Sequence, residues 1–395
     1  MPRFEPFPAL RYAASDLGPL VAPPYDVLSD AELDELEACH RHNIVHVDVP
    51  RERDGADRYE AAATRLRGWI ADGVMVRDTE PSFTLYRMRF TDESGRAREI
   101  VGVMGALEVV DEGAGGVLPH ERTTPKASTD RLDLTRATEA NLSPIWGLSL
   151  AGGLTAALTA PGDLVGSVTV DGVEHSVERV TDPVRLAEIA ALVGGGDVLI
   201  ADGHHRYSVS RTYRDEVRAR TGTHDSPAEL TLAFVSELVE DQLSVAAIHR
   251  IYRSIDREAL VAALDAGFEM SPAGPVGAGT LAEMQDRGSL VLVDRGGNGT
   301  WLDPRPGAFD DVRALDGAWL ERLLATSDAD TAYQHGVDEV LALMRDDPSV
   351  VAAVLIRPVS VAEIERTARE GLLMPPKSTF FTPKLRTGFV VRQLA

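Results

Sequence analysis

The segment from Gly194 to Arg220 constrains the fold of this chain more than any other part of its sequence. Its first part, DVLIA at 197–201, is a short apolar run of the kind found in buried strands. Asp202 and Gly203 then predict a tight turn, and an amphipathic helix is expected from His204 onward. A buried strand that turns directly into a helix indicates a protein of mixed α/β or α+β structure.

The residues at this turn also make the strongest candidate site. The first N–H groups of a helix have no partner within it and the helix dipole is positive there, so anions bind readily. His204, His205 and Arg206 add donors in the first turn, directly after Asp202. Asp202 is a candidate metal ligand, or a carboxylate that orients a histidine. The alternative is an ordinary turn whose histidines face solvent.

The overall charge argues against nucleic acid as a partner. Lys and Arg number 40 against 62 Asp and Glu, so the formal net charge is −22. Such a surface repels a phosphate backbone except at a local basic pocket. One cysteine, Cys39, excludes a disulfide framework. There is no apolar run of about 18 residues and no apolar signal core, so we expect a cytoplasmic protein without membrane contact.

The distribution of lysine is unusual. Only Lys126, Lys377 and Lys384 are lysines among the 40 basic residues, and each follows a proline. Where arginine serves as the general cation, a lysine supplies a compact, mobile ammonium that suits a phosphate or carboxylate site. All three are therefore candidate ligands, with a chance distribution as the alternative.

Four further stretches carry candidate residues. At 118–126 the carboxylate of Glu121 lies among basic residues that favour its ionised form, as a general base requires; a metal ligand or a salt-bridged surface loop are the alternatives. The others are a rigid proline turn at 23–27, a helix break at 141–145 and a proline-flanked loop at 374–384, each of which is also compatible with a purely structural role. Besides Glu121, the candidates are His120, Arg122 and Lys126; Tyr25 and Asp26; Asn141 and Ser143; and Lys377, Ser378, Thr379 and Lys384.

The length of 395 residues suggests two or three domains, at roughly 150 residues each. We predict an N-terminal α/β unit at 1–105, a site domain at 106–255 and a C-terminal α+β unit at 256–395, whose lysine-bearing loop closes over the site. Local patterns predict a helix capped by Ser29 or Asp30, a strand at 44–49, a helix at 57–72, strands at 82–90 and 99–110, a hairpin at Asp171-Gly172, strands at 289–294 and 350–359, and helices at 328–345 and 361–371.

The motifs PPYDVLS, LPHERTTPK, RATEANLSPIWG, ADGHHRY and MPPKSTFFTPKLRTGFV occur in this order across nearly the whole chain. Together they resemble the domain-of-unknown-function family number 1015. Most members of that family carry no assigned activity, so the resemblance implies a fold more than a reaction.

A more distant resemblance covers about residues 118–215. The strand–DGHHR–helix element is similar to the phosphate-binding signature of the ParB/sulfiredoxin-like fold, which includes free-serine kinases. This resemblance implies a central ParB/sulfiredoxin-like domain, with Glu121 as the base and Asp202 as the residue that positions magnesium or serine. It also implies that His204, His205 and Arg206 hold the phosphoryl group. The acidic chain departs from the DNA-binding members of that superfamily, so a partition role is not expected.

Three functions remain open from the sequence. The first is a kinase that phosphorylates free L-serine or a similar small hydroxyl compound, with Mg²⁺ and a nucleotide or pyrophosphate as donor. The second is a phosphohydrolase or nucleotidase on the same anion site. The third is a non-enzymatic module that binds a nucleotide or phosphate. The sequence contains no G-x-G-x-x-G, G-x-S-x-G or H-E-x-x-H motif in a supporting context. The oligomeric state is not predicted.

Overall fold

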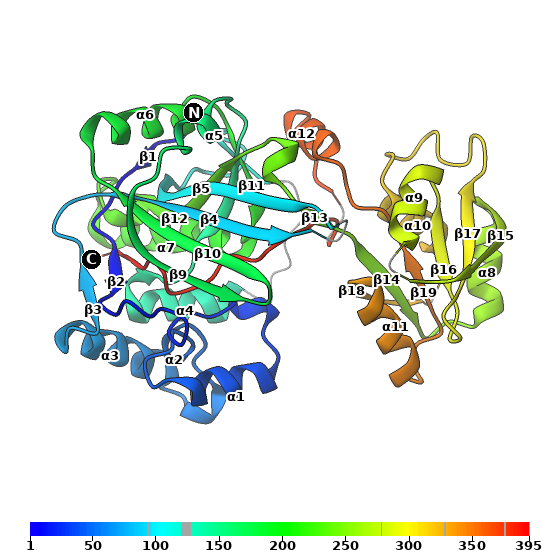
Figure 1. The fold of residues 1–395 in the computed structure, drawn as a ribbon, viewed down its shortest axis with the longest axis horizontal. Coiled ribbons are helices and arrows are strands. Elements are labelled where there is room, and N and C mark those ends of the chain that lie inside the picture. Colours follow the sequence, from blue (N-terminus) through cyan, green and yellow to red (C-terminus); the bar gives the residue numbers. More distant parts are fainter. Residues whose placement is uncertain (93–94, 120–127, 278, 328, 375–376, 395) are drawn as a thin grey trace. The chain divides into compact units, whose positions relative to one another are not determined.

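The computed structural model describes residues 1–92, 95–119, 128–277, 279–327, 329–374 and 377–394. The chain forms two compact units. The first contains Met1–Leu243, Thr367–Leu372 and Pro383–Ala395, and the second contains Ser244–Arg366 and Leu373–Thr382. Both units combine helices with sheets (Figure 1), which confirms the predicted mixed α/β class. The three-part division at residues 105 and 255 stays a prediction.

A mixed sheet forms the centre of the first unit. Its strands are β1 (Phe4–Glu5), β4 (Phe83–Thr91), β5 (Ala97–Glu108), β6 (Val117–Leu118), β8 (Ile145–Ser149), β9 (Asp163–Val170), β10 (Val173–Val180), β11 (Val198–Asp202) and β12 (Leu230–Glu237). Among the described residues their order is β6-β11-β8-β12-β5-β4-β10-β9, with β1 beside β5. β11 runs parallel to β6, and β12 runs parallel to β8; the other neighbours are antiparallel.

The longest strands follow the sequence patterns closely. β4 and β5 lie where alternating and Val-rich runs predicted them, and the central residues of both are buried. The predicted hairpin joins β9 to β10, with Asp171 at φ +53° and Gly172 at φ +74°. Two successive positive φ angles define the tight turn whose twist matches that of the paired strands.

Helices cover the sheet of the first unit. They are α1 (Asp30–Cys39), α2 (Val45–Asp48), α3 (Arg58–Ala71), α4 (Ser128–Thr138), α5 (Leu154–Ala157), α6 (Pro183–Gly194) and α7 (His204–Thr221), with a short 3₁₀ turn at Tyr25–Val27. Ile189 and Val193 of α6 pack with Val103 and Val235 of the sheet in one core cluster. In Figure 1, α5 and α6 lie near one edge of this unit, and α1, α2 and α3 lie near the opposite edge.

One predicted helix start and one predicted strand can be compared directly with the structure. Ser29 caps α1 through a capping box with Glu32, as its position predicted. The strand expected at 44–49 is wrong, because these residues form α2. The side chain of Asn43 accepts a hydrogen bond from the Val45 N–H at 3.1 Å, a local contact that favours a helical turn over a strand.

The last residues of the chain return to the first unit. Strand β21 (Arg392–Gln393) pairs with β7 (Ala140–Asn141), and Val391 forms a backbone bridge with Leu10, which lies in β2 (Leu10–Tyr12) beside β3 (Met75–Arg77). Phe389, Val390 and Val391 are buried there. This return places residues near 384 beside elements that occur about half a chain length earlier in the sequence.

The second unit is an antiparallel sheet between two layers of helices. Its strands are β14 (Ile248–Arg253), β15 (Phe268–Pro275), β16 (Leu290–Val293), β17 (Asn298–Pro304), β18 (Asp330–His335) and β19 (Ala352–Leu355), in the order β15-β17-β16-β19-β14-β18. A separate pair joins β13 (Val245–Ala246) to β20 (Phe380–Phe381). The helices are α8 (Arg257–Asp265), α9 (Thr280–Arg287), α10 (Asp316–Leu324) and α11 (Val337–Asp346), and α12 (Val361–Arg369) follows β19.

Alternate residues of β16 show why both faces of this sheet are covered. Leu290 and Leu292 pack with residues of α8 and α10, whereas Val291 and Val293 pack with residues of α9 and α11. Successive side chains of a strand point to opposite faces, so an uninterrupted apolar run requires a core on each side.

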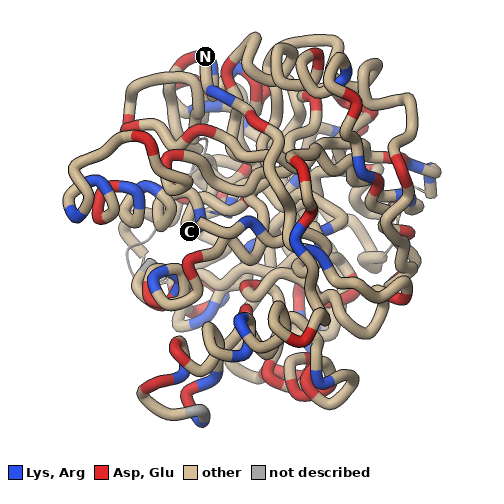
Figure 2. Tube along the Cα trace, turned by 90° about the vertical axis from the view of Figure 1, so that its left-hand side faces the viewer, with Lys and Arg blue, Asp and Glu red and all other residues tan. Residues whose placement is uncertain are grey.

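Charged residues are spread along the trace rather than gathered in one region. Figure 2 shows acidic and basic positions interspersed over the face that it presents. Within the described ranges, none of the helices combines the length and the apolar character needed to cross a membrane.

Candidate functional site

The candidate site is built on the turn between β11 and α7. Asp202 ends the strand, Gly203 has φ +86°, and His204 begins the helix. A Cβ atom at Gly203 would lie 3.0 Å from Nε of Arg206 and 3.1 Å from a methyl carbon of Ile145. Both the backbone conformation and the space therefore require glycine here, which explains the Asp-Gly pair in the sequence.

Three groups with positive or donor character converge on the Asp202 carboxylate. Nζ of Lys384 lies 3.2 Å from Oδ2, Nη2 of Arg206 lies 3.4 Å from the same oxygen, and the Gly203 N–H donates to Oδ1 at 2.9 Å. Burial alone would raise the pKa of Asp202, but Lys384 and Arg206 outweigh it and hold this pKa well below its usual range. His204 adds to the same effect. Asp202 is thus a carboxylate that holds two cations at a helix start.

Arg206 also reaches a second group of buried charges. It lines a cavity of about 40 Å³ together with Asp48 and Arg131. Nη1 of Arg131 donates to the backbone oxygen of Asp48 at 2.6 Å and lies 3.4 Å from its Oδ1. Burial raises the pKa of Asp48, which is only 3% exposed, although both arginines act against that rise. A carboxyl in this position holds a proton more readily than an exposed one.

Tyr25 and Asp26 belong to the same electrostatic neighbourhood. The guanidinium of Arg131 lies over the Tyr25 ring, 4.3 Å from its centroid. Burial works to lower the pKa of Arg206, but Asp202, Asp26 and Tyr25 together raise it. The proline turn therefore contributes charge to this cluster, and its role in binding stays a prediction.

Asn141 and Ser143 also line the small cavity beside Arg206. Asn141 has a structural task as well, because its side-chain oxygen accepts a hydrogen bond from the Leu232 N–H at 3.0 Å and lies 3.4 Å from Nη1 of Arg392. Asn141 therefore borders the cavity, and its binding role stays a prediction.

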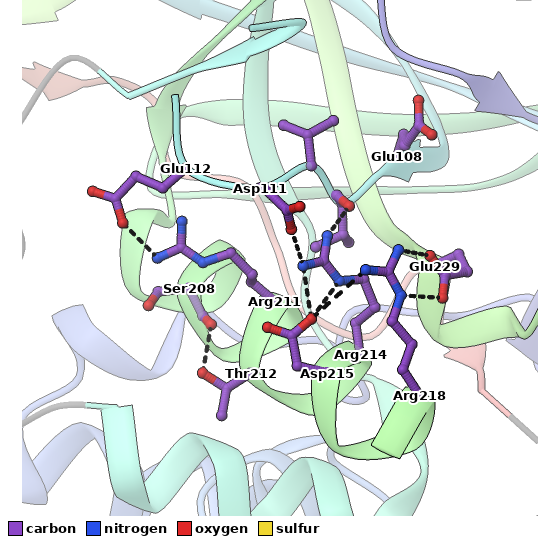
Figure 3. A network of polar contacts seen from close by, with 12 residues as sticks. Glu108, Asp111, Glu112, Ser208, Arg211, Thr212, Arg214, Asp215, Arg218 and Glu229 are labelled. Carbon is purple, nitrogen blue, oxygen red and sulfur yellow. Dashed lines mark hydrogen bonds and ion pairs between the residues drawn. The ribbon is translucent and has the colours of Figure 1, made fainter. Parts of the chain in front are cut away.

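An ion-pair network holds α7 in place behind the site (Figure 3). Arg214, which is 2% exposed, donates to the Val109 carbonyl and contacts Asp111 and Asp215. Arg218 pairs with both oxygens of Glu229, at 2.9 and 2.5 Å. These contacts lie on the face of α7 toward the end of β5 and the start of β12, so they fix the direction in which the helix start points.

The remaining candidates fall into two groups. His120, Glu121, Arg122 and Lys126 lie outside the described residues. Lys377, Ser378 and Thr379 belong to the second unit, where the Lys377 carbonyl accepts a hydrogen bond from Nη1 of Arg250 at 3.2 Å. The prediction that the lysine-bearing loop closes over the site has two parts, and for Lys384 the structure shows an ion pair with Asp202. The part that concerns Lys377 stays a prediction, as do the contacts of His205 with a ligand.

The donor set around Asp202 does not fit a divalent cation. Both of its oxygens already face positive or donor groups, and a divalent ion would be repelled by the adjacent ammonium and guanidinium. In the described part of the chain, no group of three or more His, Cys, Asp or Glu side chains is arranged to hold a metal ion. The Mg²⁺ role of Asp202 therefore stays a prediction of the sequence, and no step of the function proposed below depends on it.

The candidates named from the sequence include neither Asp48 nor Arg131. The signal for Asp48 was present, since it is the only charged residue in the run IVHVDV at 44–49. A carboxylate in such an apolar run is expected to be buried, and a buried carboxylate needs a cationic partner from elsewhere. The partner itself, Arg131, is separated from Asp48 by 83 residues and could not be identified from the sequence.

These features define a mixed α/β protein with a buried cluster of charges at the start of a helix. The chain belongs to the family described as "Protein of unknown function (DUF1015)", whose model matches residues 4–318. This confirms the family resemblance that the motifs indicated. No curated protein matches the sequence.

Several solved structures have some similarity to this chain. A conserved hypothetical protein from Pyrococcus furiosus is 12% identical, with a TM-score of 0.38, and the match covers 70% of this chain and 92% of that one. A free serine kinase in complex with AMP is 13% identical, with a TM-score of 0.37 and coverages of 69% and 89%. SbnI with a C-terminal truncation, from Staphylococcus aureus, is 12% identical, with a TM-score of 0.39 and coverages of 73% and 87%. Because these identities and TM-scores are low, only the geometry of the site can indicate a function.

Proposed function

We propose that this protein is a small-molecule phosphotransferase, a kinase that phosphorylates the hydroxyl of free L-serine or a similar small acceptor from a nucleotide or pyrophosphate. The observation that supports it most strongly is the convergence of Lys384 and Arg206 on Asp202 at the start of α7. Phosphoryl transfer depends mainly on positive groups and donors held around the transferred phosphate, and on a positioned acceptor hydroxyl.

Each described residue has a definite task in this proposal. The backbone N–H groups of the first turn of α7 bind phosphate oxygens, because the helix has no carbonyl one turn before them to accept their hydrogen bonds. Lys384 and Arg206 neutralise the charge that develops on the transferred group, and Asp202 holds both cations in place before the donor arrives. Gly203 lets the backbone approach the phosphate without a side chain in the way.

The acceptor side of the reaction requires a base that takes the proton of the attacking hydroxyl. The distant resemblance to the ParB/sulfiredoxin-like fold assigns the base to Glu121, and this assignment stays a prediction because Glu121 lies outside the described residues. Asp48 is the described carboxyl whose raised pKa suits a proton carrier, and it shares a cavity with Arg206. A comparison of E121Q with D48N therefore decides which carboxylate accepts the hydroxyl proton.

The test is a direct assay of phosphoserine formation. The full chain is incubated with L-serine, MgCl₂ and either ATP, ADP or pyrophosphate, and the product is measured by mass spectrometry. We expect phosphoserine from one of the donors, and a loss of at least about a hundredfold in K384M and D202N. K384M removes a cation that stabilises the transferred group, and D202N removes the carboxylate that holds both cations in place. The matched control is D265N, which removes one carboxylate from a surface pair with Arg305 in the second unit.

Two other results would replace this proposal. Release of phosphate at the same rate with and without serine, lost in K384M, would identify a phosphohydrolase or nucleotidase with water as acceptor. Binding of a nucleotide without any turnover would identify a regulatory module. Wild-type rates in both K384M and D202N would remove the cluster at α7 from the site altogether.

A further inference from the structure

A second cavity lies in the first unit, and the residues that line it do not include Asp202, Arg206 or Lys384. Its volume is about 330 Å³, which falls in the usual range of roughly 300–1,000 Å³ for small-molecule sites. The start of the chain, the loop between α7 and β12, and strand β21 form its walls. Nothing in the proposed reaction uses it.

Arg392 is the unusual residue of this cavity. Its side chain belongs to a residue that is 5% exposed, and it forms no ion pair with a carboxylate among the described residues. Nη1 donates to the Leu230 carbonyl at 2.8 Å, and Nη2 donates to the Pro227 carbonyl at 2.9 Å. Burial lowers the pKa of Arg392 to about 10, although the negative charge of Glu5 acts against that fall. A buried cation of this kind is costly unless a negative group accompanies it.

Two buried polar atoms on residues that line the cavity lack hydrogen-bond partners. They are Nε of Arg392 and Oγ of Ser226, neither of which has an acceptor or donor in the described part of the chain. Buried polar groups are almost always paired, so two unpaired ones beside a single cavity indicate that a bound group completes them. On a guanidinium, Nε and Nη2 share one edge, which matches the two oxygens of a carboxylate.

The rest of the lining limits what the bound anion can be. Phe7 and Leu230 supply apolar wall, so the ligand has an apolar body as well as a charge. Charged residues of both signs also border the cavity. Glu5 is paired with Arg3 and Glu229 with Arg218, and Arg77 and Asp225 are opposite in sign, so these side chains together add little net charge. The positive charge of Arg392 is thus matched best by a single negative charge.

We propose that this cavity is a second binding site, for a small organic monocarboxylate held by Arg392 and Ser226. The carboxylate accepts hydrogen bonds from the edge of the Arg392 guanidinium and from the Ser226 hydroxyl, while its apolar part lies against Phe7 and Leu230. The site is separate from the phosphotransferase site and does not depend on that function.

The test measures ligand binding rather than activity. Isothermal titration calorimetry of the full chain is carried out with benzoate, hexanoate and acetate, with benzamide as an uncharged analogue of benzoate and with inorganic phosphate. We expect one-to-one binding of benzoate or hexanoate, no binding of benzamide, and weaker binding of acetate because it lacks the apolar body. The variant S226A is expected to bind about tenfold more weakly, since it loses one hydrogen bond to a charged group.

Two controls locate the binding. S176A removes a buried serine hydroxyl outside the cavity and should bind as the wild type does. D202N alters the phosphotransferase site and should also leave carboxylate binding unchanged, so failure of either proposal can be told from failure of the other. Equal binding of benzamide, binding of phosphate in place of the carboxylates, an unchanged affinity in S226A, or no binding of any carboxylate would each overturn the proposal.

Discussion

Gly203 is the residue on which the candidate site depends most directly. Its φ of +86° disfavours any other residue, and an added Cβ would press against Arg206 and Ile145. We expect G203A to lose about 1–2 kcal/mol from the backbone alone and more from the displaced Arg206. The matched control is G222A at the other end of α7, where φ is +70° and no atom lies within 4 Å of the added Cβ.

Urea unfolding and phosphate-donor binding measure the two effects separately. Both variants should be less stable than the wild type, but only G203A should lose binding of the donor. If G222A and G203A lowered donor affinity equally, the effect would come from general destabilisation of α7 and not from the turn.

His175 makes stability depend on pH. Its Nδ1 lies 2.7 Å from the Tyr86 hydroxyl, and burial, assisted by Arg386, lowers its pKa to about 3. The folded state therefore keeps the imidazole neutral, whereas the unfolded chain takes up a proton below about pH 6.5. The stabilisation is complete above about pH 6.5 and is lost as the pH falls toward 3.

This pH effect can be isolated with H175Q, which retains a hydrogen-bonding group but does not titrate. Between pH 7.5 and pH 5, the free energy of unfolding of the wild type should fall by about 2 kcal/mol more than that of H175Q. Parallel pH profiles for the two proteins would show that His175 is protonated as easily in the folded state as in the unfolded one.

At the scale of single elements, the arginines of α7 contribute very different amounts to the stability of the fold. Arg214 is buried and donates to the Val109 carbonyl, whereas Arg211 forms a surface pair with Glu112, whose side chain is 83% exposed. We expect R214L to cost about 3 kcal/mol, because it leaves a buried carbonyl unpaired, and R211Q to change stability by less than about 0.5 kcal/mol. Urea denaturation of both variants makes the comparison, and equal losses would contradict it.

Elements with a strong local signal were predictable from the sequence, and the contacts between distant elements were not. The capping box at Ser29, the hairpin at Asp171-Gly172 and the strand–turn–helix at Asp202 each carry their structure in neighbouring residues. The run at 44–49 was misread because four to six apolar residues fit a strand and a short buried helix equally well. Asp48 and Arg131 meet only in the folded chain.

At the scale of the whole molecule, the chain leaves the first unit after Leu243 and forms most of the second. It contributes Thr367–Leu372 to the first unit and Leu373–Thr382 to the second, and it returns to the first from Pro383 onward. The ion pair between Lys384 and Asp202 joins residues 182 positions apart, and local patterns contain no trace of it. The motif around Lys384 indicated a site residue, but only the return of the chain shows which carboxylate it meets.

Deletion of residues 383–395 tests how far the first unit depends on this return. The deletion removes the pairing of β21 with β7 and the buried Phe389 and Val391, each of which contributes about 1.5–3 kcal/mol through burial. With Val390 and Leu394 also lost, the total approaches the 5–15 kcal/mol that typically holds a domain together.

The two core clusters of the second unit contain none of the deleted residues, so that unit should keep its own cooperative transition in urea. K384M is the matched control, because it should keep both unfolding transitions and lose only donor binding. If the deletion variant also kept both transitions, the first unit would fold without its last strand.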